Sequence, residues 1–160
     1  MMIIIMQIIL QPILFQPDKD IISSLEKTLS EEFDASSIVA APPIKEISDQ
    51  FFDKQRKQWK SNDILQWLSD KYKLFSKPTK ILAICDFDAY SGNLNFVFGE
   101  ADLDGSISAI YLPTLRQEFY GLKPDESVFG PVKLSVVTSH QMNKQSKFDT
   151  NSHCIIHENK

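Results

Sequence analysis

The feature that most constrains the fold is a continuous apolar run near the start of the chain, from Ile3 to Leu10, in which only Gln7 is polar. Its isoleucines are β-branched, as is typical of strands, and Pro12 bounds the run. The run is too short to cross a bilayer. It also lacks the basic start and the small-residue cleavage site of a targeting segment. The run therefore predicts a strand that is buried on both faces of a sheet.

Amphipathic helices and further apolar strands follow this run along the chain. A helix predicted from Pro17-Asp18 to about Phe33 places Ile21, Leu25 and Leu29 on one face. The other expected elements are a short strand from Ser37 to Ala41, a polar and aromatic connector from Ile44 to Lys60, a helix from Ser61 or Asn62 to Lys77-Pro78, strands over Lys80–Cys85, Leu94–Phe98 and Ser106–Leu112, and a last helix from Pro131 to about Lys147. The alternation predicts an α/β (α+β) fold, in which a mixed sheet is packed with helices.

Length, charge and cysteine content restrict the class of protein. A chain of 160 residues is expected to form one domain spanning residues 1–160. The net charge of −4 does not favour a nucleic acid or an anionic membrane as a partner. Only two cysteines are present, Cys85 and Cys154, so a disulfide framework is not expected. We therefore expect a cytoplasmic protein that binds neither nucleic acid nor membrane.

Four segments, taken in order, resemble the motifs of one family. They are the opening strand with its Gln-Pro turn; Pro42-Pro43 followed by Asp53, Arg56, Gln58 and Trp59; Ile81–Ile84 with Asp86, Asp88, Tyr90 and Leu94–Gly99; and Ile110, Leu112, Leu115, Arg116, Phe119, Tyr120 and Gly121. Together they resemble the archaemetzincins, which are small zinc metallopeptidases of the zincin type. Residues 1–121 carry the resemblance, and residues 122–160 diverge from it.

The resemblance implies a zincin-like twisted mixed sheet, an active-site helix near the C-terminus and zinc-dependent peptide hydrolysis of the aminopeptidase type. The family signature on that helix is HExxHxxGxxHC. Two histidines one helical turn apart reach the same Zn²⁺, and the glycine permits the turn that returns a third histidine. The glutamate takes a proton from the zinc-bound water. The resemblance thus implies zinc as the cofactor and a peptide or protein as the substrate.

The equivalent stretch of this chain departs from the signature. His140 fits the first ligand, but Gln141 occupies the position of the general-base glutamate, and an amide cannot act as a base. Lys144 stands where the second histidine belongs, and an ammonium has no lone pair for a metal. Lys147 replaces the glycine, and Thr150 falls at the third ligand position. No catalytic set is intact, so we expect impaired hydrolysis with residual peptide binding along the sheet edge, and weak or absent zinc.

Two other interpretations stay open. His153-Cys154 imitates the His-Cys end of the signature three residues late, and His157 follows it. An active metallopeptidase could therefore use an atypical zinc site of His140, His153 and either His157 or Cys154. The chain could instead be a truncated or frameshifted product without function, because the resemblance weakens after Gly121. Reading the coding DNA of this region in all frames separates that last interpretation from the others.

The resemblance also suggests where a substrate would bind. In zincins an edge strand pairs with the extended substrate, and we expect either Leu94–Phe98 or Ser106–Leu112 to be that strand. This expectation makes Asn95, Phe96, Val97 and Phe98 candidate substrate-binding residues, although Phe96 and Phe98 also fit a core. Tyr120 is a further candidate, because a tyrosine near the metal can stabilise an oxyanion.

Two aspartates, Asp86 and Asp88, lie on a polar loop directly after a predicted buried strand. Loops in this position often carry function, so the carboxylates could bind a cation or orient a neighbour. A capped, solvated turn before Gly92 is the favoured explanation of the two aspartates. We expect them to shape the loop rather than to take part in catalysis.

Overall fold

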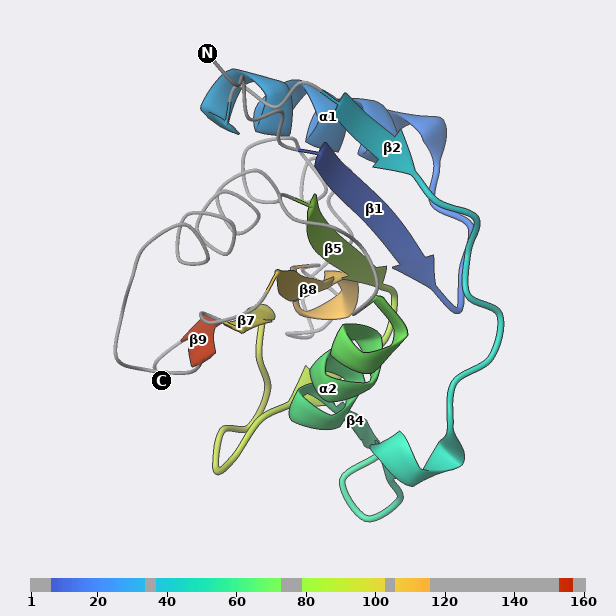
Figure 1. The fold of residues 1–160 in the computed structure, drawn as a ribbon. Helices are drawn as coiled ribbons and strands as arrows, with labels where there is room; N and C mark the ends of the chain where they lie inside the picture. Colours follow the sequence, from blue (N-terminus) through green and yellow to red (C-terminus); the bar gives the residue numbers. More distant parts are fainter. Residues whose placement is uncertain (1–6, 34–36, 73–78, 103–105, 116–152, 157–160) are drawn as a thin grey trace, which may run out of the picture.

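The computed structural model of the protein describes residues 7–33, 37–72, 79–102, 106–115 and 153–156. Six strands form a mixed sheet in the order β2-β1-β5-β8-β7-β9 (Figure 1). Their bounds are β1 Gln7–Ile13, β2 Ser37–Ala40, β5 Thr79–Cys85, β7 Gly99–Asp102, β8 Ile107–Tyr111 and β9 His153–Ile156. Strands β2, β1, β5 and β8 are parallel, and β7 is antiparallel to both of its neighbours. The predicted fold class is confirmed.

One helix packs on each face of the sheet. Successive residues of the central strands point to opposite faces, and apolar side chains on both faces need to be covered. Helix α1, Lys19–Phe33, follows β1, and helix α2, Ser61–Tyr72, precedes β5. The buried side chains that pack with α1 include Ile8, Leu10, Leu25, Leu29, Leu82, Ile84 and Ile110, and those that pack with α2 include Ile9, Ile13, Ile64, Leu65, Leu68, Ile81, Cys85 and Tyr111. The central strands are therefore covered on both faces, as the apolar runs predict.

Strand β1 continues through Pro12 instead of ending before it, and Gln11 explains how. The carbonyl of Pro12 accepts a hydrogen bond from the N–H of Ile44 (2.9 Å), beyond the end of β2. A residue with an N–H at position 12 would donate on the same side, toward Pro42, but proline has no such donor. The side-chain amide of Gln11 donates to the Pro42 carbonyl in its place (2.9 Å). A buried glutamine thus compensates for a proline in an inner strand.

The connector predicted from Ile44 to Lys60 contains regular structure. A 3₁₀ turn, η1 Asp49–Phe51, begins after Ser48, whose side chain accepts a hydrogen bond from Gln50 N–H. Strands β3 Phe52–Asp53 and β4 Gln58–Lys60 then form a hairpin, and β6 Ala89–Tyr90 pairs with β4. This small second sheet ties the connector to the loop that follows β5, which accounts for its length.

The prediction of a strand over Leu94–Phe98 is wrong. These residues form a loop, and the strand β7 begins directly after them, at Gly99. The turn bond from Leu94 N–H to the Ser91 carbonyl (3.1 Å) and the bond from Val97 N–H to the Ala89 carbonyl (3.0 Å) direct this segment toward the small sheet. Ser106–Leu112 is close to β8, but β8 lies between β5 and β7. It is therefore an inner strand and not the predicted edge.

Some of the remaining predicted elements are present in the structure, and others fall on residues that the structure does not describe. The helices from Pro17-Asp18 and from Ser61 are confirmed, and a second 3₁₀ turn, η2 Leu112–Leu115, follows β8. The last predicted helix, from Pro131 to Lys147, lies outside the described residues. Strand β9 has no counterpart in the sequence predictions. Within the described part of the chain, neither helix is long and apolar enough to cross a membrane.

Replacement of Gln11 by methionine tests the compensation for Pro12. The variant keeps the volume of the side chain but leaves the Pro42 carbonyl and the Tyr72 hydroxyl, which also bonds to Gln11, without this partner. We expect the free energy of unfolding to fall by about 1–3 kcal/mol, measured by urea denaturation. Gln7→Met, at the half-buried start of the same strand, is the matched control and should change stability by less than about 0.5 kcal/mol. Equal effects of the two substitutions would contradict the role of Gln11.

Candidate functional site

Residues from two of the four segments that resemble the family form a network between the β3–β4 hairpin and the loop after β5. Arg56 donates from Nη2 to the carbonyls of Leu94 (2.6 Å) and Asn95 (3.3 Å), and from Nε to Oε1 of Gln58 (3.0 Å). Gln58 donates in turn to Oδ2 of Asp88 (3.0 Å) and to the Asn95 carbonyl (2.7 Å). Two residues of the hairpin thereby hold the backbone of the loop at Leu94 and Asn95.

Asp53 organises the turn of the same hairpin. Its Oδ1 accepts hydrogen bonds from the N–H groups of Gln55 (3.0 Å) and Arg56 (3.1 Å), and its Oδ2 accepts one from the Tyr90 hydroxyl (2.8 Å). The Arg56 guanidinium lies 3.7 Å from the centre of the Tyr90 ring. The hydrogen bond from the Arg56 backbone, followed by that from Tyr90, lowers the pKa of Asp53 below its ordinary value. The ionised aspartate is therefore the form that this turn stabilises.

The two loop aspartates do not form a metal centre in the structure. Burial raises the pKa of Asp88, and its hydrogen bond from Gln58 opposes this effect. The carboxylate of Asp88 thus orients Gln58, in agreement with the expected role in loop shape. Among the residues that the structure describes, no group of three or more histidine, cysteine, aspartate or glutamate side chains could hold a metal ion.

The predicted substrate-binding residues Asn95, Phe96, Val97 and Phe98 lie in a loop. Phe96 and Val97 are buried, and Phe96 packs against Phe98 with ring centres 5.6 Å apart. The Asn95 carbonyl is occupied by Arg56 and Gln58. This segment therefore offers no extended edge to a peptide, and it serves the core and the network.

The predicted metal-site residues fall mostly outside the described residues. Tyr120, His140, Gln141 and His157 lie there. The backbone of His153 and Cys154 belongs to β9, which pairs with Asp102 and Ala101 of β7.

Strand β7 would form an edge of the main sheet without β9, which pairs with it in this structure. The register joins Gly99 to Ile156 and Asp102 to His153 in an antiparallel ladder. The other neighbour of β7 is β8. Strand β9 therefore lies where an extended segment adds to this edge, and it is supplied by a part of the chain far from β7 in sequence.

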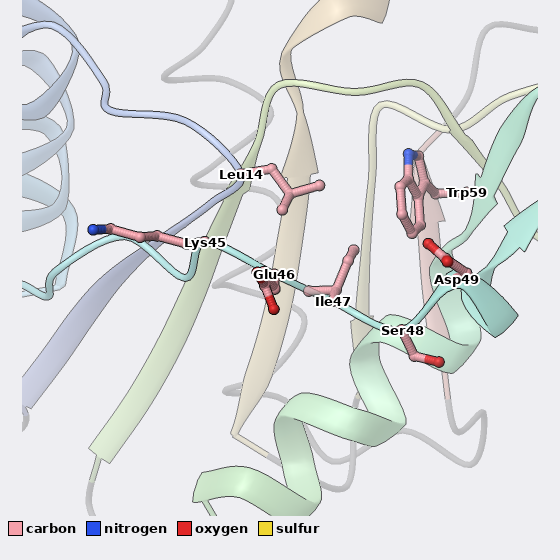
Figure 2. Close-up of a pocket in the computed structure, with 7 residues that line it drawn as sticks. All are labelled: Leu14, Lys45, Glu46, Ile47, Ser48, Asp49 and Trp59. Carbon is pink, nitrogen blue, oxygen red and sulfur yellow. The ribbon is translucent and has the colours of Figure 1, made fainter.

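An open groove of about 540 Å³ lies at the end of β1, lined by Leu14, Lys45, Glu46, Ile47, Ser48, Asp49 and Trp59 (Figure 2). We call it the Trp59 groove. Trp59 is held by ring contacts with Phe52 (5.1 Å) and Phe87 (5.2 Å) and by a hydrogen bond from its backbone N–H to the Asp88 carbonyl (2.9 Å). The sequence predictions identified Trp59 as part of a motif but missed this groove, because its walls come from separate parts of the chain.

Leu14, at the rim of this groove, has an unusual backbone conformation. Its φ is 64°, in the left-handed region, which costs a residue other than glycine about 1–2 kcal/mol. The hydrogen bond from its N–H to the Ile44 carbonyl (2.8 Å) holds it there. The side chain is 38% exposed although it is apolar. Neither the conformation nor the exposure favours folding, and such features are more common at functional positions.

Archaemetzincins from several archaea resemble this chain in sequence. No family model matches it. An archaemetzincin of Methanocaldococcus jannaschii is 36% identical over 130 residues, which cover 79% of this chain and 65% of that relative. An archaemetzincin of Archaeoglobus fulgidus is 30% identical over 119 residues, which cover 72% of this chain and 67% of the relative. The chain thus spans about two thirds of the length of these relatives.

Solved structures share the fold. The crystal structure of an archaemetzincin from Archaeoglobus fulgidus matches this chain with a TM-score of 0.67 and 20% identity. The matched region covers 91% of this chain and 81% of the archaemetzincin chain. The crystal structure of a zinc-dependent peptidase from Methanocorpusculum labreanum matches with a TM-score of 0.70 and 20% identity. The matched region covers 86% of this chain and 80% of the peptidase chain. At this level of identity the likeness establishes the architecture alone.

The lowered pKa of Asp53 predicts how the stability of the hairpin depends on pH. A lowered pKa means that its contribution to stability is present above the ordinary value of 3.8 and is lost as the pH falls toward the lowered value. We expect the difference in free energy of unfolding between the native protein and Asp53→Asn to shrink as the pH falls below 3.8. Urea denaturation followed by tryptophan fluorescence measures this difference. Asp88, whose pKa is raised, is present in both proteins, so its opposite effect cancels in the comparison.

Tyr90→Phe is the matched variant for this measurement, because it removes one hydrogen bond to Asp53 and keeps the two backbone bonds. Its pH dependence is expected to be weaker than that of the native protein but not absent. A difference between the native protein and Asp53→Asn that stays constant or grows at low pH would contradict the assignment.

Proposed function

This chain belongs to the archaemetzincin family, and we propose that it keeps the peptide-binding edge of the family sheet while its zinc-dependent peptide hydrolysis is impaired. Its relatives include archaemetzincins at 36% and 30% identity, and one protein with the same fold is a zinc-dependent peptidase. Peptide hydrolysis with zinc is also the activity that the resemblance to the family implies. Binding and hydrolysis use different parts of such a fold, so one can persist without the other.

The observation that carries the impaired activity is the pair Gln141 and Lys144. Gln141 stands where the signature has its glutamate, and a neutral amide has no basic lone pair with which to take a proton from water. Lys144 stands one helical turn after His140, where the second imidazole should bind the metal. Its positive charge repels a divalent cation. Each change alone removes a group that the hydrolytic route requires.

The donor set of this chain therefore does not fit the catalytic zinc site of the family. A tetrahedral catalytic site needs three protein ligands and one open position for water, and only His140 of the expected ligands is present at its place. His153, Cys154 and His157 are additional donors, but they lie off the spacing of the signature. We assign no hydrolytic step to a metal in this chain.

Support for peptide binding comes from β7. Extended peptides add to sheet edges through main-chain hydrogen bonds, with little demand on the sequence of the peptide. In the structure β9 forms such an antiparallel ladder on β7, over four residue pairs. The geometry of β7 is thus suitable for an added strand. This edge replaces Leu94–Phe98 and Ser106–Leu112, which the sequence predicted as the pairing strand.

Zinc affinity and activity test the catalytic part of the proposal. The native protein is expected to bind less than one zinc ion per chain, and chelators should not change any cleavage of unblocked aminoacyl substrates. Lys144→His is expected to raise zinc affinity by about tenfold or more, because it supplies a second imidazole on the side of His140. Competition with a fluorescent chelator measures the affinity.

Gln145→His is the matched control, because a residue five positions after His140 lies on another side of a helix. It should leave zinc affinity unchanged. The atypical-site interpretation would instead be supported by stoichiometric zinc in the native protein, loss of that zinc in His153→Ala, and chelator-sensitive hydrolysis. That combination would refute the proposed impairment.

Deletion of residues 153–160 tests the peptide-binding edge. Strand β9 competes with any added peptide at an effective concentration near the millimolar range, as expected for a tethered segment. Removing it should raise the affinity of β7 for a labelled, extended apolar peptide by about tenfold, as measured by fluorescence anisotropy. Deletion of residues 157–160 alone keeps β9 and is the control. Absence of saturable binding in all three proteins would show that the edge does not bind peptides.

A further inference from the structure

The Trp59 groove lies near the point where the order of the parallel strands reverses direction in the sheet. The chain passes from β1 to β2 on one side of β1 and then returns to β5 on the other side. In open α/β sheets, ligands bind at the carboxyl ends of the parallel strands near such a reversal. Leu14 directly follows β1, and Trp59 contacts Phe87, which comes shortly after β5. The groove is therefore placed like a ligand site, independently of β7 and its proposed peptide.

Three apolar side chains converge on the groove from different segments. Figure 2 shows Leu14, Ile47 and Trp59 pointing into the space between the end of β1 and the small sheet. Trp59 is half-buried, and its contacts with Phe52 and Phe87 fix its orientation before any ligand arrives. The volume of about 540 Å³ lies within the range of small-ligand sites. The groove can thus cover an aliphatic chain without rearrangement of its wall.

The charge that faces this space is negative. Figure 2 shows the carboxylate of Asp49 pointing toward the Trp59 ring, while Lys45 and Glu46 extend away from the groove. Lys60, the neighbour of Trp59, donates from Nζ to the Gln50 carbonyl (3.3 Å). A cation beside Trp59 therefore meets one carboxylate and an indole, which is the aromatic ring that attracts cations most strongly. An anionic ligand would be repelled by Asp49.

We propose that the Trp59 groove binds a lysine or arginine side chain of another polypeptide. The aliphatic stem lies against Leu14 and Ile47, and the cationic head lies between Trp59 and Asp49. Long basic side chains have this amphipathic shape, with an apolar stem and a charged tip. The left-handed conformation of Leu14 then has a function, because it holds an apolar side chain over the stem.

The experiment uses the full chain with Trp67→Phe, so that Trp59 is the sole tryptophan. Blocked tripeptides with a central lysine, norleucine or glutamate are titrated while Trp59 fluorescence and its indole N–H resonance are followed. The lysine peptide should give saturable changes. The norleucine peptide, which has the same stem without charge, should bind at least about threefold more weakly, and the glutamate peptide should not bind.

Two variants separate the contributions of charge and shape. Asp49→Asn, at an exposed position, should weaken binding of the lysine peptide about fivefold, whereas Glu31→Gln on α1 should leave it unchanged. Leu14→Gly suits the left-handed φ and should not unfold the protein, but it removes a wall of the groove and should weaken all binding. The proposal is overturned if Trp59 shows no saturable response to the lysine peptide. It is also overturned if norleucine binds as well as lysine, or if Asp49→Asn has no effect.

Discussion

Burial of β1 and β5 on both faces is the constraint on which the rest of the structure depends. Strands that are apolar on both sides require a helix on each face, and α1 and α2 occupy these places. Since crossovers between parallel strands are right-handed, helices on opposite faces require one connection that runs from β1 to one side of it and a second that returns to its other side. The observed order β2-β1-β5 follows from this rule. So does the separation of the loops in which the Trp59 groove lies.

Polar side chains then join loops that the strands have separated. Gln11 supplies the donor that Pro12 lacks, which lets β1 extend toward Leu14. Arg56 and Gln58 perform the corresponding task on the other side, where they hold the carbonyls of the loop after β5. In both places a buried or half-buried amide satisfies backbone groups that no strand reaches. This is the general requirement for backbone groups that leave a sheet.

Local signals were sufficient for the elements that depend on hydrophobic pattern. The apolar runs of β1 and β5 and the faces of α1 and α2 could be predicted, because burial determines both the pattern and the structure. Leu94–Phe98 was misassigned because it alternates like a strand, whereas its backbone bonds go to the Ala89 carbonyl and Arg56. The Trp59 groove and β9 depend on contacts between distant segments. The local hydrophobic pattern of the sequence indicates neither of them.

Residues from two of the four segments that resemble the family build the network, and this limits what the resemblance implies. Asp53, Arg56, Gln58, Asp88 and Tyr90 bond to one another or to nearby backbone. A likeness in these positions therefore establishes the scaffold. In the proposed function, catalysis would depend on a separate stretch around His140, where Gln141 and Lys144 stand at the positions of the base and the second ligand. Because the two sets of residues have different physical tasks, the proposed loss of hydrolysis does not require loss of the fold.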